Sequence, residues 1–281
     1  ILGLTIDYGP YGWLEDFDPS WTPNTTDAQH RRYRFGNQPQ VAHWNLAQLG
    51  NALIPLIGDV EPLQVALDGF VDRYQRGYQT MMAAKLGIGE FDPSTDDALI
   101  EGVVAVLQLA ETDMTIFFRQ LADVDLDATG DARFAPLLDA YYQPEQLTGE
   151  VRTSIDGWLD ALGERVAAAG RSPDDRRQAM QAVNPKYVLR NYLAQLAIDD
   201  AEAGDFTKID ELLAAADEAI TEAVDEAETD AEAGGKLLRK LRIGCKQIVR
   251  LFKIMLHIKE ILPVAGRHIF PLSFANGGLP D

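Results

Sequence analysis

Apolar residues repeat with a helical period over most of the chain. In the segment VAHWNLAQLGNALIPLI, for example, Ala42, Leu46, Leu49 and Leu53 fall close together on one helix face. The period predicts helices over 41–57, 61–86, 94–122, 151–169 and 174–182, and two more within 184–216 that separate at Gly204. Strand-like patterns are almost absent after residue 10. The predicted fold class is therefore mainly α.

The N-terminal region departs from this helical pattern. Residues 2–6 read as a short apolar strand, and the turn residues Gly9, Pro10 and Gly12 end it. The chain then runs to about Pro39 without a lasting period and is rich in Pro, Asn, Thr, Asp and aromatic residues. We expect a long ordered loop here, and such loops are usually functional in compact domains.

Charge and composition narrow the class of protein. The chain of 281 residues carries a formal net charge of −19. This charge repels phosphate backbones, so it argues against nucleic acid as a partner. No apolar run reaches the ~18 to 20 residues that span a bilayer. A single cysteine, Cys245, excludes an internal disulfide and suits a reducing, cytoplasm-like compartment, or the mitochondrion if the source is eukaryotic.

The last third of the chain changes charge abruptly. Residues 199–232 hold 14 acidic side chains and one basic residue, Lys208, whereas 236–281 hold nine Lys or Arg. The basic stretch 236–262 has the pattern of an amphipathic helix. Such a helix can lie on an anionic membrane or fill a groove of a partner protein. Packing against the acidic segment is the alternative that we favour.

The candidate chemistry lies in Asp7-Tyr8-Gly9, directly after the predicted strand. A strand fixes the backbone, a carboxylate supplies hard oxygen ligands for Mg²⁺, and a following glycine permits the turn that aims the carboxylate. Kinase-like folds use this pattern to hold the metal bound to nucleotide phosphates. The alternative is plain turn chemistry, because Asp before Gly is common in turns.

Three longer stretches strengthen the first interpretation. They are D-Y-G-P-Y-G from Asp7, F-x-N-Q-P-x-x-x-x-W-N-L from Phe35 to Leu46, and N-P-x-x-V-L-R-N-x-L-A-Q from Asn184 to Gln195. Together and in this order they resemble the SelO family (selenoprotein O, also named YdiU), from residue 1 to about residue 214. Members of that family have a protein-kinase-like fold and act as protein adenylyltransferases.

The resemblance implies both a fold and an activity. Residues 1–214 would be a kinase-like C-lobe that lacks the N-lobe and starts at the strand before D-Y-G, with 8–39 as an activation-type loop. Residues 215–281 would be an extra helical tail, acidic and then basic. Asp7 would bind Mg²⁺ or Mn²⁺ and, through it, ATP, and AMP would pass to a Ser, Thr or Tyr hydroxyl of a protein substrate.

The family's other catalytic groups precede its D-Y-G and are not in this sequence. These groups are the glycine-rich loop, the phosphate-contacting Lys and Arg, the base and the second metal ligand. We therefore expect no catalytic residue in this chain besides the ligand Asp7, and no adenylylation by the chain alone. The competing hypothesis is a non-catalytic helical interaction module that works through its basic helix.

Several motif residues have a structural and a functional interpretation. The stretches Asn37-Gln38-Pro39 and Trp44-Asn45 could contact substrate or nucleotide, but we favour a buried polar cluster that pins the long loop onto the first long helix. Arg190 and Asn191 fall within a predicted helix and an apolar stretch. There a buried ion pair is favoured over a phosphate contact. The four histidines have no metal-ligand spacing.

Overall fold

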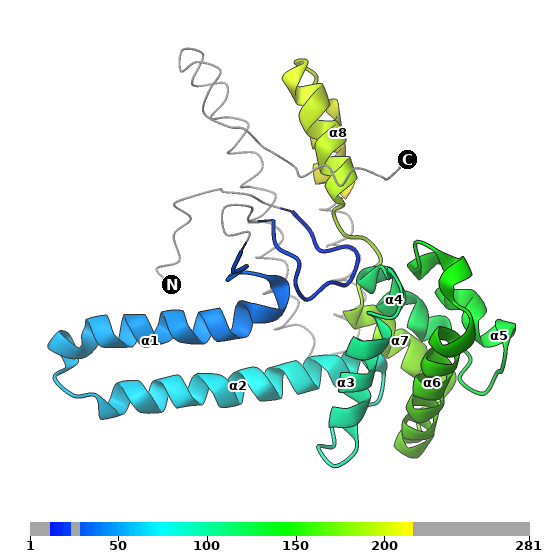
Figure 1. Cartoon of the computed structure of the whole chain (residues 1–281), viewed down its shortest axis with the longest axis horizontal. Coiled ribbons are helices and arrows are strands. Elements are labelled where there is room, and N and C mark those ends of the chain that lie inside the picture. Colours follow the sequence, from blue (N-terminus) through cyan, green and yellow to red (C-terminus); the bar gives the residue numbers. More distant parts are fainter. Residues whose placement is uncertain (1–11, 24–28, 216–281) are drawn as a thin grey trace. The chain divides into compact units, whose positions relative to one another are not determined.

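The computed structural model describes residues 12–23 and 29–215. Within these residues the fold is helical, and β structure is limited to two isolated bridges. The chain divides into two compact units, Ile1–Tyr192 and Leu193–Asp281. The prediction of a mainly α fold is confirmed for the described part of the chain (Figure 1).

A long antiparallel hairpin follows the N-terminal loop. It consists of α1 (Gln38–Ile57) and α2 (Glu61–Leu86), which lie side by side in Figure 1. Pro39 sits in the first turn of α1, where its missing N–H costs no helical hydrogen bond. Gly58 ends the helix with φ of 77°, a left-handed conformation that favours glycine. The 3₁₀ helix η1 (Phe35–Asn37) leads into α1.

The predicted single helix over 94–122 is wrong. The structure has α3 (Asp96–Val106) and α4 (Met114–Gln120), separated by a non-helical segment. The backbone of Thr112 and Asp113 in that segment forms bridges with Tyr141 and Asp16. Pairing with segments distant in the sequence therefore overrides the local helical period.

Shorter elements connect α4 to the next long helix. They are η2 (Leu121–Asp123), α5 (Asp131–Phe134), η3 (Ala135–Ala140) and η4 (Pro144–Gln146). The helices α6 (Gly149–Ala169) and α7 (Pro173–Val183) then follow close to their predicted bounds. Ser172 caps α7 by accepting a hydrogen bond from the backbone N–H of Asp175.

One hydrophobic core joins the end of α2 to α3, α4, η3, α6 and α7. Its fully buried members include Leu86, Phe117, Leu137, Leu159, Leu162 and Met180. Trp158 packs against Phe117 at 6.2 Å between ring centroids, and its indole N–H donates to the carbonyl of Leu99 at 3.0 Å. This core is the rigid base from which the loop contacts described below are made.

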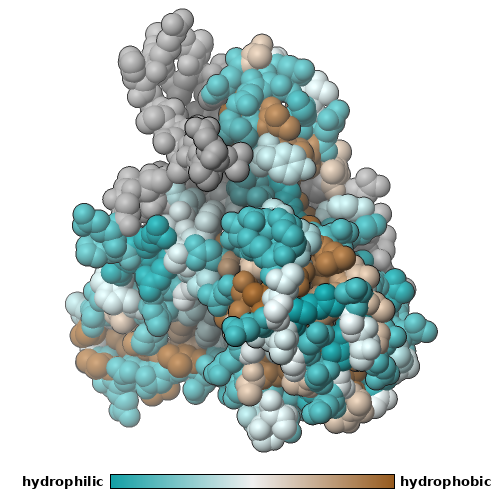
Figure 2. All heavy atoms as spheres, turned by 45° about the vertical axis from the view of Figure 1, so that its right-hand side comes forward, coloured by the Kyte–Doolittle hydropathy of each residue, from teal (hydrophilic) through white to brown (hydrophobic). Residues whose placement is uncertain are grey.

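The surface carries apolar side chains as separate patches. The face in Figure 2 is largely hydrophilic, with apolar residues between the polar ones. On the hairpin, Leu56 is 82% exposed and Val65 is 65% exposed. No helix in the described ranges is long and apolar enough to cross a membrane.

The second unit is described only to residue 215. Helix α8 (Asn191–Glu202) begins at the junction of the two units, and residues 207–215 are again helical. The predicted break at Gly204 is confirmed, with φ of 94° at that residue. The prediction that places Arg190 inside a helix is wrong, because residues 184–190 are not helical and α8 starts only at Asn191. The basic segment 236–262 lies outside the described residues.

Candidate functional site

The predicted metal ligand Asp7 lies outside the described residues, which begin at Gly12. The structure does describe the loop into which the D-Y-G segment runs. This loop, from Trp13 to Phe17, meets three other parts of the first unit. We call this meeting point the loop anchor and define it by residues 13–17, 111–114, 140–142 and 190–191.

Backbone hydrogen bonds form the centre of the loop anchor. The N–H of Phe17 donates to the carbonyl of Thr112 at 2.9 Å, and the N–H of Met114 donates to the carbonyl of Glu15 at 3.2 Å. On its other side the same segment donates from the N–H of Asp113 to the carbonyl of Ala140 at 2.7 Å. Residues 111–114 therefore lie between the loop and residues 140–142 and bond to both, which fixes the loop to the core.

Asn191 holds the start of the loop from the side. Its Oδ1 accepts from the N–H of Trp13 at 2.8 Å, and its Nδ2 donates to the carbonyl of the same residue at 2.7 Å. The backbone N–H of Asn191 donates to Oε1 of Glu15 at 2.8 Å. A side-chain amide that pairs with both backbone groups of one residue replaces the bonds of a strand partner. Both backbone polar groups of Trp13 are thereby bonded to Asn191.

Arg190, the residue before Asn191, forms an ion pair within the loop anchor. Nη1 of Arg190 binds Oδ2 of Asp113, whose side chain is only 4% exposed, whereas that of Arg190 is 19% exposed. Oδ1 of Asp113 also caps α4, because it accepts from the N–H of Ile116 at 2.9 Å. The hydroxyl of Tyr142 donates to Oδ2 of Asp113 at 3.4 Å. The predicted ion-pair role of Arg190 is confirmed.

Burial and neighbouring carboxylates raise the pKa values of two groups in the loop anchor. Burial raises the pKa of Asp16, and the neighbouring carboxylate of Glu111 adds to the rise, against the opposing effect of the hydrogen bond from the N–H of Thr112. Burial, together with the charge of Asp113, raises the pKa of Tyr142 to about 12. The phenol therefore stays protonated at neutral pH and acts as a donor.

The carboxylates of the loop anchor hold the chain in position through hydrogen bonds. Across residues 12–23 and 29–215, no group of three or more His, Cys, Asp or Glu side chains is arranged to hold a metal ion. The carboxylates of Asp16 and Asp113 instead accept hydrogen bonds from protein N–H groups.

The second motif, around Asn37, also has a positioning role. Nδ2 of Asn37 donates to the carbonyl of Arg32 at 2.6 Å, and Nε2 of Gln38 donates to the carbonyls of Tyr33 and, at 3.2 Å, Arg34. These amides pin the end of the long loop onto α1, as we favoured from the sequence. The prediction that this cluster is buried is wrong, because Gln38 is exposed and Trp44 is 49% exposed.

Asn184, the first residue of the third motif, ties α2 to α7. It is fully buried, and its Nδ2 donates to the carbonyl of Lys85 at 3.0 Å. Its Oδ1 accepts from Nζ of Lys85 at 2.8 Å, and this ammonium group lies 4.7 Å from the ring centroid of Phe118. Burial lowers the pKa of Lys85 to about 8. The motif therefore supplies structural contacts at its first residue, Asn184, and at Asn191.

Sequence reasoning missed Asp113, Glu15 and Tyr142. One signal was available for Asp113, because Thr112-Asp113 before an apolar run has the residue types of a helix N-cap. It would have divided the predicted helix over 94–122 at the correct place. Nothing local marks Glu15 or Tyr142, because their partners lie far away in the sequence.

Comparison with known proteins defines the class of molecule. The family model described as "Protein adenylyltransferase SelO" matches residues 1–217. The chain therefore belongs to the SelO family.

Three relatives illustrate this relationship, and all three are named "Protein nucleotidyltransferase YdiU". The protein from Rhodopirellula baltica is 51% identical over 223 residues, which cover 76% of this chain and 41% of the relative. The one from Flavobacterium johnsoniae is 50% identical over 212 residues, covering 75% and 40%. The one from Aromatoleum aromaticum is 52% identical over 213 residues, covering 76% and 40%. The chain thus spans about two fifths of the length of these relatives.

Proposed function

We propose that this chain is the C-terminal part of a protein adenylyltransferase. In this role it contributes Asp7 as the ligand of an Mg²⁺ or Mn²⁺ ion that carries ATP. The whole protein then transfers AMP to a Ser, Thr or Tyr hydroxyl of a protein substrate. The observation that carries the proposal is the family match over residues 1–217, which includes the D-Y-G segment.

The loop anchor supports this role physically. Asp7 lies six positions before Trp13, so the Cα atoms of the two residues can be at most roughly 20 Å apart. The hydrogen bonds to Trp13 and Glu15 fix the part of the loop that follows the D-Y-G segment. Less entropy is then lost when a metal–nucleotide complex binds, which is the advantage of a preorganised site.

The fold assignment is part of the same proposal. Residues 1–214 form a kinase-like C-lobe in which 8–39 is the activation-type loop, and 215–281 form the tail. A bound divalent ion would neutralise phosphate charge and help to align the attacking and leaving oxygens. This chain would contribute the carboxylate of Asp7 and the loop after it, which the loop anchor fixes at residues 13–17.

The experiment measures the transfer of a labelled phosphate group from ATP to protein, with and without the part of the protein that is encoded upstream. The 281-residue chain and the same chain extended by its own upstream coding sequence are incubated with Mg²⁺ and ATP labelled at either the α- or the γ-phosphate. We expect the extended protein to transfer the α-label to protein and the chain alone to transfer none. Transfer of the γ-label by the extended protein would show a kinase instead. Transfer of the α-label by the 281-residue chain would overturn the expectation that it is inactive alone.

A further inference from the structure

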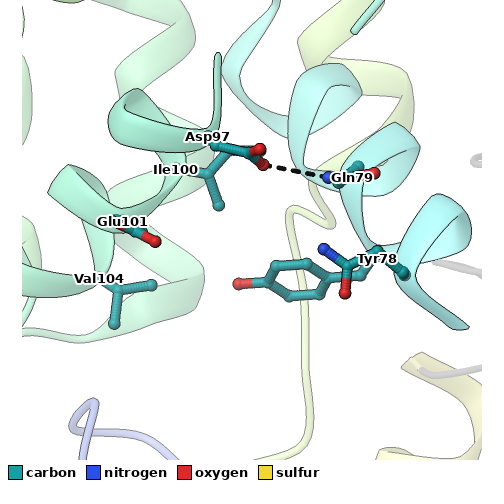
Figure 3. A pocket seen from close by; sticks show the side chains of 7 residues that line it. Tyr78, Gln79, Asp97, Ile100, Glu101 and Val104 are labelled. Carbon is teal, nitrogen blue, oxygen red and sulfur yellow. Dashed lines mark hydrogen bonds between the residues drawn. The ribbon is translucent and has the colours of Figure 1, made fainter. Parts of the chain in front are cut away.

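A pocket of about 250 Å³ lies between α2 and α3, away from the residues of the loop anchor. Figure 3 shows how it is built: Tyr78 extends from α2 toward α3, which contributes Asp97, Ile100, Glu101 and Val104. Two glutamines of α2 complete the lining. Ile100 is buried and the two carboxylates are exposed, so the pocket has an apolar floor and an acidic rim.

The carboxylates of Asp97 and Glu101 are placed so that they repel each other. Asp97 and Glu101 lie four positions apart on α3, so they occupy neighbouring places on one helix face. Like charges at this spacing repel each other. The lining contains no Lys, Arg or His, and Asp97 accepts from Nε2 of Gln79 at 3.0 Å. A cation held between the two carboxylates would remove the repulsion.

The ring of Tyr78 favours a guanidinium group over other cations. Tyr78 is half-buried, and its ring extends from α2 into the pocket toward α3 (Figure 3). A planar guanidinium can stack on such a ring while its N–H groups donate to carboxylate and amide oxygens. Its aliphatic stem fits the floor of Ile100 and Val104. An ammonium group has one compact charge and uses the ring and both carboxylates less fully.

We propose that this pocket binds an arginine side chain of a partner polypeptide. The net charge of −19 supports a basic partner, because the field of the chain raises the local concentration of cationic segments. The proposal does not rest on the adenylyltransferase function. It rests on the cavity, the paired carboxylates and the ring of Tyr78.

The test uses the 281-residue chain with labelled Ile and Val methyl groups, and three blocked tripeptides as probes. The probes carry arginine, citrulline or lysine between two glycines, and citrulline keeps the shape of arginine without its charge. We expect saturable NMR shifts at Ile100 and Val104 with the arginine peptide, with a dissociation constant on the order of 1 mM. The lysine peptide should bind several-fold more weakly, and the citrulline peptide should not bind measurably.

Variants locate the binding. The double variant Asp97→Asn/Glu101→Gln should weaken arginine binding at least about tenfold, because it removes both charge-assisted acceptors. Glu101→Gln alone leaves the contact with Gln79 intact and should weaken binding less. The matched control Glu150→Gln/Glu164→Gln changes the same charge on α6, outside the pocket, and should leave binding unchanged. Equal binding of the citrulline peptide, unchanged binding by the double variant, or shifts that avoid Ile100 and Val104 would overturn the proposal.

Discussion

The ion pair between Arg190 and Asp113 leads to a quantitative prediction for stability. The substitution Arg190→Gln removes the cation but leaves a carboxylate whose side chain is 4% exposed. Breaking a buried pair in this way costs about 3–5 kcal/mol of unfolding free energy. We expect about 3 kcal/mol, because Asp113 keeps the N–H of Ile116 and the hydroxyl of Tyr142 as donors.

Substitution of the other member of the ion pair should cost less unfolding free energy. Asp113→Asn keeps an oxygen that can cap α4, and the remaining Arg190 side chain is 19% exposed and can reach water. We expect a loss of about 1–2 kcal/mol, and a double variant that costs less than the sum of the two single variants. The matched control is Arg177→Gln, whose pair with Asp123 is 55% and 38% exposed. That change should cost less than about 1 kcal/mol.

Urea unfolding at pH 7, followed by tryptophan fluorescence, measures these values. All four tryptophans lie in the first unit, so the signal reports the part of the chain that holds the ion pair. The slope of free energy against urea should stay the same among the variants. The reasoning would be refuted if Arg190→Gln cost no more than Arg177→Gln.

Two further predictions concern the end of α2. The pKa of Lys85 falls from 10.5 to about 8 on folding. The unfolded chain therefore binds more protons between these values, so stability should rise with pH from about 8 to 10 relative to Lys85→Met. Urea titrations at several pH values test this, and a difference that stays flat with pH would contradict it. Gly87→Ala should lower the unfolding free energy by about 2–3 kcal/mol, because φ is 70° and the new Cβ would lie 2.8 Å from the side chain of Met180. The control Gly58→Ala has a similar φ of 77° but open space around the new Cβ, so it should cost about 1 kcal/mol. Thermal melts compare the two variants, and equal losses would show that the contact with Met180 does not matter.

The sequence was sufficient where local forces decide the structure. The helical period placed α2 over its observed bounds, and Gly204 marked a real break. Asn37 and Gln38 bond to carbonyls only a few positions away, so their pinning role could be predicted from the motif. In each case the partner is near in the sequence.

Long-range partners could not be predicted in the same way. The ion-pair role of Arg190 followed from its charge in an apolar stretch, but nothing local identified Asp113 as its partner. Asn191 bonds to Trp13 across most of the first unit. The helix predicted over 94–122 failed for the same reason, because pairing with Asp16 and Tyr141 divides it. The pairing between the segments of the loop anchor therefore could not be predicted from any one of them.

The role of Asp7 is tested most directly by Asp7→Ala in the chain extended by its upstream coding sequence. The measurement is the rate of AMP transfer from ATP to protein, with the exposed Asp68→Ala as the matched control. A metal ligand contributes several kcal/mol to charge neutralisation, so we expect a loss of at least about 100-fold with unfolding stability unchanged. A variant that keeps AMP transfer within about twofold of the control would show that this carboxylate does not hold the nucleotide's metal.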